Sequence, residues 1–293
     1  MRMSLPVLLV HWNRPDVCVR AVAAFHSQSL PVEITILDNA SSAENLERLR
    51  AQVAPRAAVR VLSDNLGFGP ALNVGLQDWL GRSGAPYIVV AAHDALPHED
   101  CLMRLVEVME RRPRCGMVSA ETGQQHVARF TGLRGPHLPS HKRGTGFSPQ
   151  DFPHGTLLLL RRDCLEDIGC FDVRYFAYGD EIDLGLRARA SGWEVGACWD
   201  ALVDNPERSV PGEVASYLQL RNAIVLVLKW KGRGWALWRS VVSVANTLRL
   251  ALVVGARPSA YSARSRLLAV RDAWAGRLGP PPKRLTAPRE SVR

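Results

Sequence analysis

Residues 169–193 have the sequence GCFDVRYFAYGDEIDLGLRARASGW, in which an aromatic-rich loop leads into carboxylates at the start of a predicted helix. Leucine and alanine residues between 184 and 190 favour that helix, and Gly192 is placed to end it. Because four aromatic side chains precede the acids, the acids are able to face a pocket. The stretch is therefore the first candidate for a reaction centre.

The acids in this stretch have two interpretations, one chemical and one structural. Asp180 and Asp183 are three residues apart and share a helix face, with Glu181 turned away from them. Acids at a helix N-terminus are stabilised by the helix dipole and by free backbone N–H groups, and Asp183 is also spaced to pair with Arg187. Capping and ion pairing explain Asp183 about as well as a chemical role does, whereas they explain Asp180 and Glu181 less well, so these two are the better candidates for chemistry.

The composition is that of a globular protein. The chain has 293 residues, of which 47% are hydrophobic and 22% charged, enough for one large domain or a domain with an appendage. Its six cysteines are scattered without a CxxC pair, which disfavours a zinc knuckle or a disulfide framework and predicts a reducing compartment. The apolar run near the N-terminus is too short for a signal peptide, so a cytoplasmic location is expected.

The positive charge is concentrated at the C-terminal end. Residues 229–293 hold 14 Lys or Arg but only two acids, Asp272 and Glu290, so residues 1–228 carry about −3 of the net charge of +9. The high isoelectric point therefore does not make the main domain a nucleic-acid binder, and no nucleic-acid partner is expected.

Short apolar runs alternate with segments of helical spacing, which predicts an α/β fold with βαβ units and a mostly parallel sheet. In such sheets, ligands bind beyond the carboxyl ends of the strands, where His11, Asn13, Asp38 and Asn65 fall. Residues 121–153 lack periodicity and are expected to form a long loop. The expected strands are 5–10, 32–37, 58–62, 87–92, 116–120, 155–160 and 193–197, with helices at 16–27, 44–53, 101–111 and 162–168, a polar turn at 200–212 and a helix from 214.

A glycine-bearing loop, DNLGFGPALNVG at 64–75, leads into another expected helix. Gly67 and Gly69 allow the backbone to approach a ligand closely, and a helix N-terminus suits a phosphate. The loop lacks the Walker lysine and the dinucleotide GxGxxG pattern, so it is equally well explained as a tight turn into a helix.

Five sequence blocks, which follow one another in the order given below, resemble the family-2 glycosyltransferases of the GT-A fold, and among them the rhamnosyltransferase-like members. A further match is Tyr217 with Arg221-Asn222, and together the matches cover about residues 1–222. The blocks are VLLVHWNRP (7–15), LDNAS (37–41), NLGFGPALNVG (65–75), YIVVAAHDALPHEDCL (87–102) and GTLLLLRRDCLEDIGCFDVRYFAYGDEIDLGLRARASGW (155–193).

The resemblance implies a mostly parallel central sheet flanked by helices. It also implies an enzyme that moves a sugar from a nucleoside-diphosphate donor to an acceptor hydroxyl with inversion. It favours dTDP- or UDP-linked donors, and a glycan, a lipid-linked sugar or a small molecule as acceptor. By matched positions it places His11, Asn13, Arg14, Asp38, Asn65, Gly67, His93 and Asp94 on the donor side, and His154 and Asp183 on the acceptor side.

The metal motif of the family is altered in this chain. Asp94 matches the last acid of the DxD motif, but the first position is Ala92, which leaves dependence on Mg²⁺ or Mn²⁺ open. Relatives carry a histidine after a later strand, where this chain has Val203-Asp204-Asn205. Since a carboxylate suits either ion, Asp204 is a candidate second ligand.

The resemblance also suggests the acceptor-activating base. In relatives the base is the second acid of a Glu-Asp-x-Asp run. Here the run is Asp180-Glu181-Ile182-Asp183, so Glu181 takes the place of the base and the first two acid types are exchanged. The chemistry needs a carboxylate within hydrogen-bond reach of the acceptor hydroxyl. Glu181 is the preferred base and Asp180 the alternative.

The C-terminal part is expected to be a helical extension at 223–278 on a catalytic domain at 1–222, followed by a disordered tail at 279–293. Its apolar stretches are interrupted by Lys and Arg and do not reach the about 18 uncharged residues needed to span a bilayer. Its four tryptophans lie among basic residues, which suits the surface of an anionic membrane at the inner face, through 229–278. Packing on the catalytic domain, or a homodimer interface, explains the same pattern equally well.

Two other functions compete with glycosyl transfer. A sugar nucleotidyltransferase would need a glycine-rich basic motif directly after the first strand, where this chain has HWNRP at 11–15. A catalytically inactive GT-A scaffold is suggested by Ala92, but the acids at 180, 181 and 183 argue against it.

Overall fold

The structure, a computed structural model, describes residues 4–82, 84–141, 144–206, 212–253 and 261–286. The chain divides into two compact units. The first unit comprises residues 1–129, 138–172 and 180–207, and the second comprises residues 130–137, 173–179 and 208–293.

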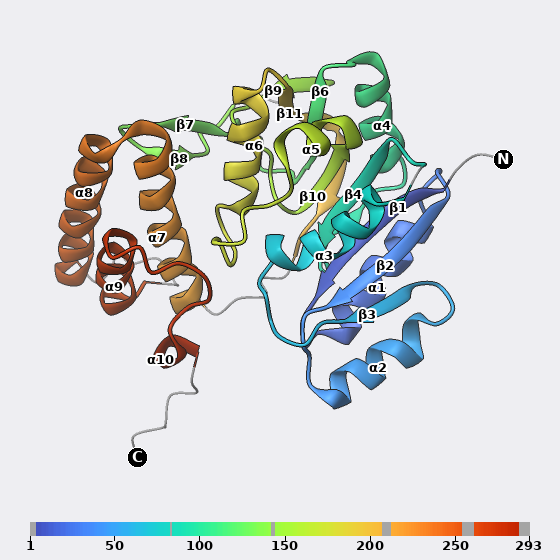
Figure 1. Cartoon of the computed structure of the whole chain (residues 1–293), viewed down its shortest axis with the longest axis horizontal. Helices are drawn as coiled ribbons and strands as arrows, with labels where there is room; N and C mark the ends of the chain where they lie inside the picture. The colour runs from blue at the N-terminus through green and yellow to red at the C-terminus, as the bar shows by residue number, and fades with distance from the viewer. Residues whose placement is uncertain (1–3, 83, 142–143, 207–211, 254–260, 287–293) are drawn as a thin grey trace. The chain divides into compact units, whose positions relative to one another are not determined.

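A mixed sheet forms the centre of the first unit, with the strand order β3-β2-β1-β4-β10-β6-β11-β5 and with β9 paired to β11 (Figure 1). The strands β1 to β4, β6 and β11 all run in one direction, because β10 is antiparallel to both β4 and β6. The expected α/β fold with a mostly parallel sheet is therefore confirmed. The strands are β1 Leu5–His11, β2 Val32–Asp38, β3 Ala58–Val61, β4 Tyr87–Ala92, β5 Leu96–Pro97, β6 Cys115–Glu121, β9 Phe147–Pro149, β10 Leu157–Arg161 and β11 Glu194–Asp204.

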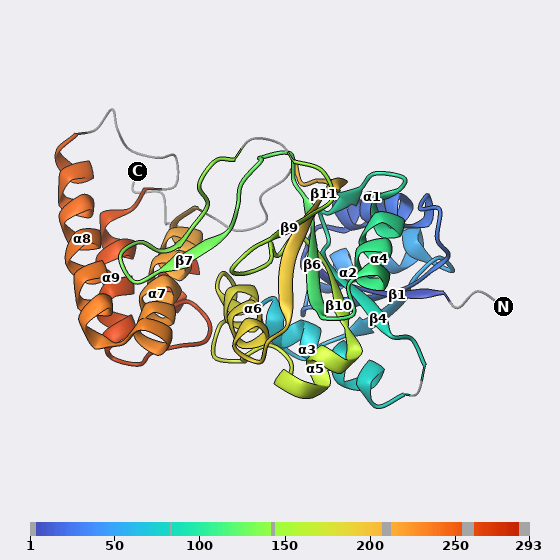
Figure 2. The ribbon, with the colours of Figure 1, turned by 90° about the horizontal axis from the view of Figure 1, so that it is seen from above.

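Helices cover both faces of this sheet, as α1 and α4 on one side and α3 and α5 on the other show (Figure 2). Alternate side chains of a strand point to opposite faces, so Val7 and Leu9 join one buried cluster while Leu8 and Val10 join the other. The first cluster takes residues from α1 Pro15–His26, α2 Ala43–Val53 and α4 Cys101–Arg111, and the second from α3 Gly69–Leu80, α5 Arg162–Ile168 and α6 Asp180–Ala190.

The strand directions bring distant segments to one edge of the sheet. β1 and β2 pair in a register that sets His11 opposite Asp38, at the carboxyl ends of both strands. β10 runs the other way and sets Leu157 opposite Ala91, so its amino end reaches the same edge. The chain just before β10 therefore lies beside the carboxyl end of β4.

Two regions differ from the sequence expectations. β11 continues to Asp204 through a register shift between Cys198 and Leu202, where a polar turn was expected from residue 200. The apolar side chains at 201 and 203 are buried, which favours continuation of the strand. Residues 207–211 of the expected turn lie outside the described residues. The expected long loop at 121–153 contains β9 and the short strands β7 Arg129–Thr131 and β8 Gly135–His137.

The second unit is mainly helical, as expected for the C-terminal extension. Its helices are α7 Gly212–Lys231, α8 Arg233–Leu252, α9 Ala263–Trp274 and α10 Lys283–Thr286. α7 runs without interruption through the boundary expected at residue 222, and α10 falls in the tail expected to be disordered, of which 287–293 lie outside the described residues. In the part of the chain that the structure describes, no helix is long and apolar enough to cross a membrane.

Candidate active site

A buried imidazole–carboxylate pair lies at the ends of β1 and β2. His11 Nδ1 is 2.8 Å from Asp38 Oδ1, and both side chains are fully buried. His11 Nε2 accepts a hydrogen bond from the backbone N–H of Arg14 at 3.1 Å, so Nδ1 carries the hydrogen and donates it to Asp38. Burial acts to raise the pKa of Asp38, but hydrogen bonds from His11 and Ser41 outweigh it, and the pKa is lowered. The pair thus holds an ionised carboxylate at this edge of the sheet.

The predicted donor-side loops are joined to one another by carboxamide groups. Asn13 has a φ of 52°, and its side-chain Oδ1 accepts a hydrogen bond from the backbone N–H of Ser42 at 2.8 Å. Asn39 donates to Asn65 Oδ1 at 3.0 Å and to the carbonyl of Gly67 at 2.8 Å. Asn13, Asn65 and Gly67 are therefore held by short polar contacts at this edge. Sequence reasoning missed Asn39, although its position directly after a strand that ends in Asp38 was a usable signal.

His93 and Asp94 follow β4 and are both almost fully buried. His93 Nδ1 lies 3.0 Å from the carbonyl oxygen of Val10, and its ring stands edge-on to His11 with centroids 5.5 Å apart. Burial, followed by the charges of His11 and Arg14, lowers the pKa of His93 to about 4. The fold thus brings His11, Arg14 and His93 together, although they come from different segments.

The amino ends of α3 and α6 are tied together by Asp180. Its Oδ2 accepts the backbone N–H of Gly69 at 2.7 Å, and its side chain is fully buried. Burial raises the pKa of Asp180 well above its usual range, and the charge and hydrogen bond of Glu181 raise it further. Asp180 therefore caps α3 in surroundings that disfavour its charged form, and the Gly69 N–H is not available to a phosphate.

Glu181 has a different environment from its neighbour. Its side chain is half-buried, and a Cβ placed on Gly155 would lie 3.5 Å from Glu181 Cγ. The amino end of β10 therefore borders this carboxylate. Of the two candidate bases, only Glu181 has solvent-accessible surface.

Replacing Gly69 with alanine is expected to destabilise the first unit by about 2–3 kcal/mol, because overpacking a buried contact costs about that much. The added Cβ would lie 2.6 Å from Asp180 Oδ2 and 2.9 Å from Phe171 Cβ. Gly81→Ala, at the other end of α3, is the matched control, since its Cβ comes no closer than 3.3 Å to another atom. Urea unfolding measures both variants, and equal stabilities would contradict the expectation.

Asp183 occupies the structural role that its spacing allowed. The carboxylate is fully buried and accepts a hydrogen bond from Arg187 Nε at 3.1 Å. Arg187 also donates to the carbonyls of Ile168 and Cys170, so the pair fixes the loop before α6. No surface of Asp183 is left for an acceptor in this arrangement, which agrees with the ion-pair alternative.

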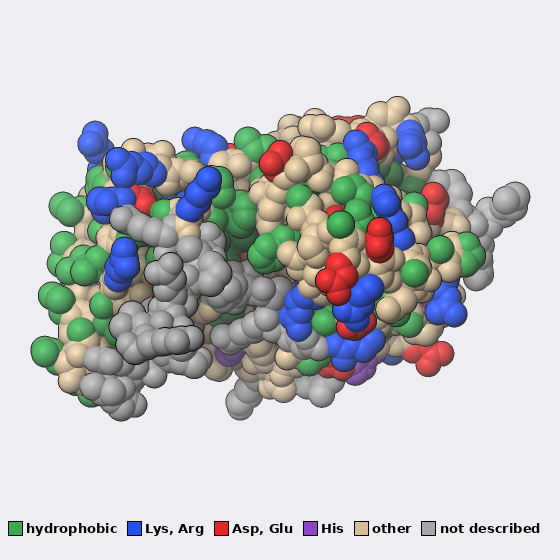
Figure 3. Space-filling model, turned by 90° about the horizontal axis from the view of Figure 1, so that it is seen from below, with side chains coloured by type: hydrophobic (Ala, Val, Ile, Leu, Met, Phe, Trp, Pro, Cys, Tyr) green, Lys and Arg blue, Asp and Glu red, His purple; other side chains and the backbone are tan. Residues whose placement is uncertain are grey.

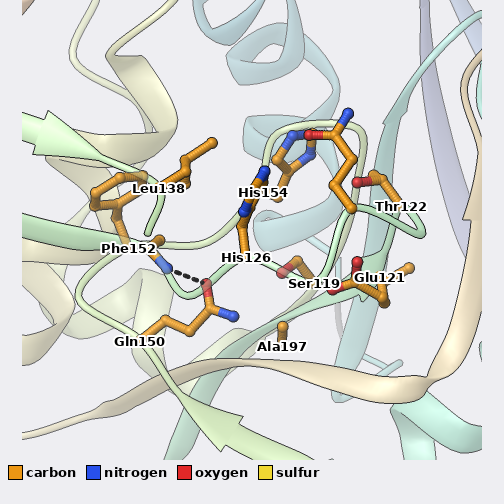
Figure 4. Close-up of a pocket in the computed structure, with 12 residues that line it drawn as sticks. Ser119, Glu121, Thr122, His126, Leu138, Gln150, Phe152, His154 and Ala197 are labelled. Atoms are coloured by element: carbon orange, nitrogen blue, oxygen red, sulfur yellow. Dashed lines mark hydrogen bonds between the residues drawn. The ribbon is translucent and has the colours of Figure 1, made fainter. Parts of the chain in front are cut away.

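His154 borders a small pocket of about 30 Å³ at the carboxyl end of β6 (Figure 4). The volume holds about two water molecules. Burial lowers the pKa of His154, against the opposing charges of Glu181 and Glu121. His126 Nδ1 is buried and has no hydrogen-bond partner among the described residues. Sequence reasoning missed His126, Glu121 and Gln150 because the segment from 121 to 153 has no periodicity to place them.

At the end of β11, Asp204 does not join Asp94 in a metal-binding cluster of the described residues, the role that the sequence suggested for it. Asp204 is exposed, and its Oδ2 lies 3.1 Å from His98 Nε2. Asn205, the residue after the end of β11, instead donates to Thr156 Oγ1 at 3.3 Å. Within the described ranges, no three His, Cys, Asp or Glu side chains converge to hold a metal ion. Asp94 and Asp204 therefore do not belong to a preformed metal cluster there.

Comparison with known proteins identifies the chain. The model of the family described as "Glycosyl transferase family 2" matches residues 7–169, more than half of the sequence. The chain belongs to this family. It is therefore a glycosyltransferase, and the resemblance inferred from its sequence blocks is confirmed.

Relatives of this family-2 glycosyltransferase include a rhamnosyltransferase. The N-acetylglucosaminyl-diphospho-decaprenol L-rhamnosyltransferase of Mycobacterium tuberculosis is 25% identical over 295 residues, which cover 84% of this chain and 94% of the relative. The O-antigen biosynthesis protein RfbC of Myxococcus xanthus is 25% identical over 214 residues, which cover 66% of this chain but only 16% of that longer protein.

Two solved structures share the fold of this glycosyltransferase. The mannosyltransferase PcManGT of Pyrobaculum calidifontis, in complex with GDP-Man and Mn²⁺, matches with a TM-score of 0.60 and 17% identity over 94% of this chain and 87% of its own. GalNAc-T7, with UDP, GalNAc and Mn²⁺, matches with a TM-score of 0.65 and 13% identity over 93% of this chain. The present chain spans 56% of the length of GalNAc-T7. The expected GT-A fold is thereby confirmed.

The Arg221-Asn222 pair of the glycosyltransferase holds the segment that precedes α6. Within the second unit, Asn222 Nδ2 donates to the carbonyls of Ala177 and Tyr178, at 2.8 and 2.7 Å. Its Oδ1 accepts a hydrogen bond from Arg221 Nε at 2.9 Å. The segment continues directly along the chain into Asp180 and Glu181, so Asn222 restrains the backbone just before the two acids.

Proposed function

We propose that this glycosyltransferase moves a sugar from a nucleoside diphosphate to an acceptor hydroxyl with inversion, and that Glu181 is the general base. The proposal rests on the contrast between the two neighbouring acids. Asp180 is fully buried and accepts the Gly69 N–H, with its pKa raised, whereas Glu181 is half-buried and borders the chain before β10.

In the proposed step, Glu181 accepts the proton of the acceptor hydroxyl while that oxygen attacks C1 of the donor sugar. The bond between C1 and the diphosphate oxygen breaks, and the nucleoside diphosphate leaves with the electron pair. Because attack comes from the face opposite the leaving group, the configuration at C1 inverts. His154 and the pocket beside it are proposed to lie on the acceptor side, because His154 is close enough to the proposed base for the charge of Glu181 to act on it.

The donor is proposed to bind across the loops after β1, β2 and β3. Asn13, Asn65 and Gly67 are held there by hydrogen bonds between the loops, so a nucleoside would meet groups that are already oriented. His11 and Asp38 are fully buried and are proposed to shape this surface from beneath. The likeness to the Mycobacterium tuberculosis rhamnosyltransferase favours a rhamnosyl donor, and the family resemblance of the sequence favours a dTDP- or UDP-linked one.

A divalent cation, Mg²⁺ or Mn²⁺, is proposed to bind together with the donor. Asp94 follows β4 as a buried carboxylate without a cluster of further ligands in the described part of the chain. Such a donor set fits an ion held by one carboxylate and substrate phosphates rather than a preformed protein site. When bound, the ion would offset negative charge on the leaving diphosphate.

The acceptor is proposed to be a lipid-linked sugar. The Mycobacterium tuberculosis relative is named for such an acceptor, a diphospho-decaprenol sugar, and the match covers almost all of it. A glycan or a small molecule remains the alternative that the assay below distinguishes.

A donor screen tests the proposed function. The purified chain is incubated with Mn²⁺ and a panel of dTDP- and UDP-sugars, and release of nucleoside diphosphate is measured with and without polyprenyl-diphosphate sugars. We expect slow release from one donor alone and faster release with the lipid-linked acceptor. Release of inorganic pyrophosphate would indicate a nucleotidyltransferase instead, and no turnover with any donor would indicate an inactive scaffold.

A further inference from the structure

In helix α8, the exposed side carries the large apolar residues and the buried side is mostly small or hydroxylic. The buried residues of α8 are mostly small or hydroxylic, namely Ala236, Ser240, Ser243 and Thr247, with Leu250 as the one large apolar residue among those described. The opposite side carries large apolar residues, among which Val241 is 55% exposed, Leu248 56% and Leu252 84%. The outer face of α8 is defined here as Trp235, Leu237, Trp238, Val241, Val242, Leu248 and Leu252.

Side-chain hydrogen bonds hold the hydroxylic residues on the buried side of α8, in addition to the packing of Ala236 and Leu250. Trp274 Nε1 donates to Ser240 Oγ at 2.9 Å, and Arg266 Nε donates to Thr247 Oγ1 at 2.8 Å. Both hydroxyls also donate to carbonyls one turn earlier in α8, at 2.8 and 2.7 Å. A helix in water normally turns its apolar stripe inward and its polar residues outward. The exposed apolar side of α8 would therefore be more stable in apolar surroundings than in water.

The surface next to the outer face is positively charged. Asp272 is the only acid between residues 229 and 286, and it is buried, where it accepts hydrogen bonds from Tyr217 and Arg271. Green apolar side chains and blue basic ones lie side by side over this part of the molecule (Figure 3). The exposed basic residues of α7, α8 and α9 are Lys229, Lys231, Arg233, Arg249, Arg264 and Arg271.

We propose that the outer face of α8 binds the surface of an anionic lipid bilayer. The apolar side chains would enter the boundary between headgroups and acyl chains, and the flanking Lys and Arg would pair with lipid phosphates. Tryptophans at positions 235 and 238 suit the same interfacial layer. The inference is independent of the acceptor proposed above, although a lipid-linked acceptor would be found at the same surface.

The charge distribution favours a bilayer over a second copy of the chain. Two copies joined through this face would bring their basic residues together, and residues 229–286 offer no exposed acid to pair with them. An anionic lipid surface supplies the missing negative charge. The outer face therefore complements lipid better than it complements itself.

Flotation of the full chain with lipid vesicles tests this proposal. The wild-type chain should float with vesicles of phosphatidylglycerol and phosphatidylcholine, and about tenfold less with phosphatidylcholine alone or at high salt. Val241→Asp combined with Leu248→Asp should lower the bound fraction at least about tenfold, because two charges would have to enter the headgroup boundary. The matched control is Val61→Asp with Val173→Asp, at valines that are 42% and 65% exposed elsewhere in the chain, and it should bind as the wild type does.

Unfolding curves and nucleoside-diphosphate release in the absence of vesicles are measured on the same proteins. Both should be unchanged in the α8 variant, which separates loss of membrane binding from loss of folding or of catalysis. Flotation of the α8 variant equal to that of the wild type would overturn the proposal. The proposal would also be overturned if the wild-type chain did not bind vesicles but formed a dimer that the α8 substitutions dissociate.

Discussion

Replacement of Glu181 by glutamine is expected to slow sugar transfer by about 10³-fold, since a positioned general base contributes about 10²–10⁴-fold. Glutamine keeps the size of the side chain but cannot accept the acceptor proton. Urea unfolding of the variant checks that the half-buried side chain at this position can be replaced without loss of the fold. Transfer is measured as nucleoside-diphosphate release with saturating donor and acceptor, and donor affinity is measured separately by calorimetry and should remain near the wild-type value.

Asp180→Asn provides the control for this prediction. The asparagine oxygen can still accept a hydrogen bond from the Gly69 N–H, and burial and Glu181 already disfavour a charge at this position by raising the pKa of Asp180. We therefore expect the rate to fall by no more than about tenfold in Asp180→Asn. A loss of transfer in Asp180→Asn together with normal transfer in Glu181→Gln would assign the base to Asp180.

Replacement of Asp94 by asparagine is expected to weaken Mn²⁺ binding, measured in the presence of nucleoside diphosphate, by at least about tenfold. Loss of the carboxylate should also slow transfer by about 10²–10³-fold, because a metal contributes several kcal/mol of charge stabilisation and each 1.36 kcal/mol is tenfold in rate. The reason is that the family resemblance aligns Asp94 with the last acid of the metal motif and Ala92 with the first, so Asp94 is the proposed ligand. Paramagnetic resonance of Mn²⁺ gives the binding readout independently of turnover.

Asp204→Asn is the matched control for Asp94→Asn. Asp204 is exposed and lies next to His98, so its replacement should leave Mn²⁺ affinity and transfer within about twofold of the wild type. If Asp204→Asn reduced Mn²⁺ affinity as strongly as Asp94→Asn does, Asp204 would be a ligand, as its place in the sequence suggested. Equal Mn²⁺ affinity in Asp94→Asn and the wild type would remove Asp94 from the metal site.

The sequence predicted most elements of the first unit because their signals are local. The strand at 87–92 and the helices at 101–111 and 162–168 have the bounds expected from apolar runs and helical spacing. The edge where His11 and Asp38 meet was also predictable, since parallel strands place their carboxyl ends together. Family resemblance then supplied the activity, which no single spacing implied.

Strand direction and side-chain burial were not predictable in the same way. The run at 157–161 has the same pattern whether it is parallel or antiparallel, yet only its antiparallel position between β4 and β6 brings His154 to the active-site edge. Asp204 and Asn205 are adjacent in sequence, and the end of β11 alone decides which of them meets Thr156.

The sequence by itself determined the class of fold, the family and the segments that carry the acids, because periodicity and motif order are properties of the chain. The tertiary structure decided which acid is buried against Gly69, which one borders β10, and which side of α8 faces outward. Those outcomes depend on contacts between residues far apart in sequence. Burial and partner determine the charge of a carboxylate, and both are set only when the segments pack.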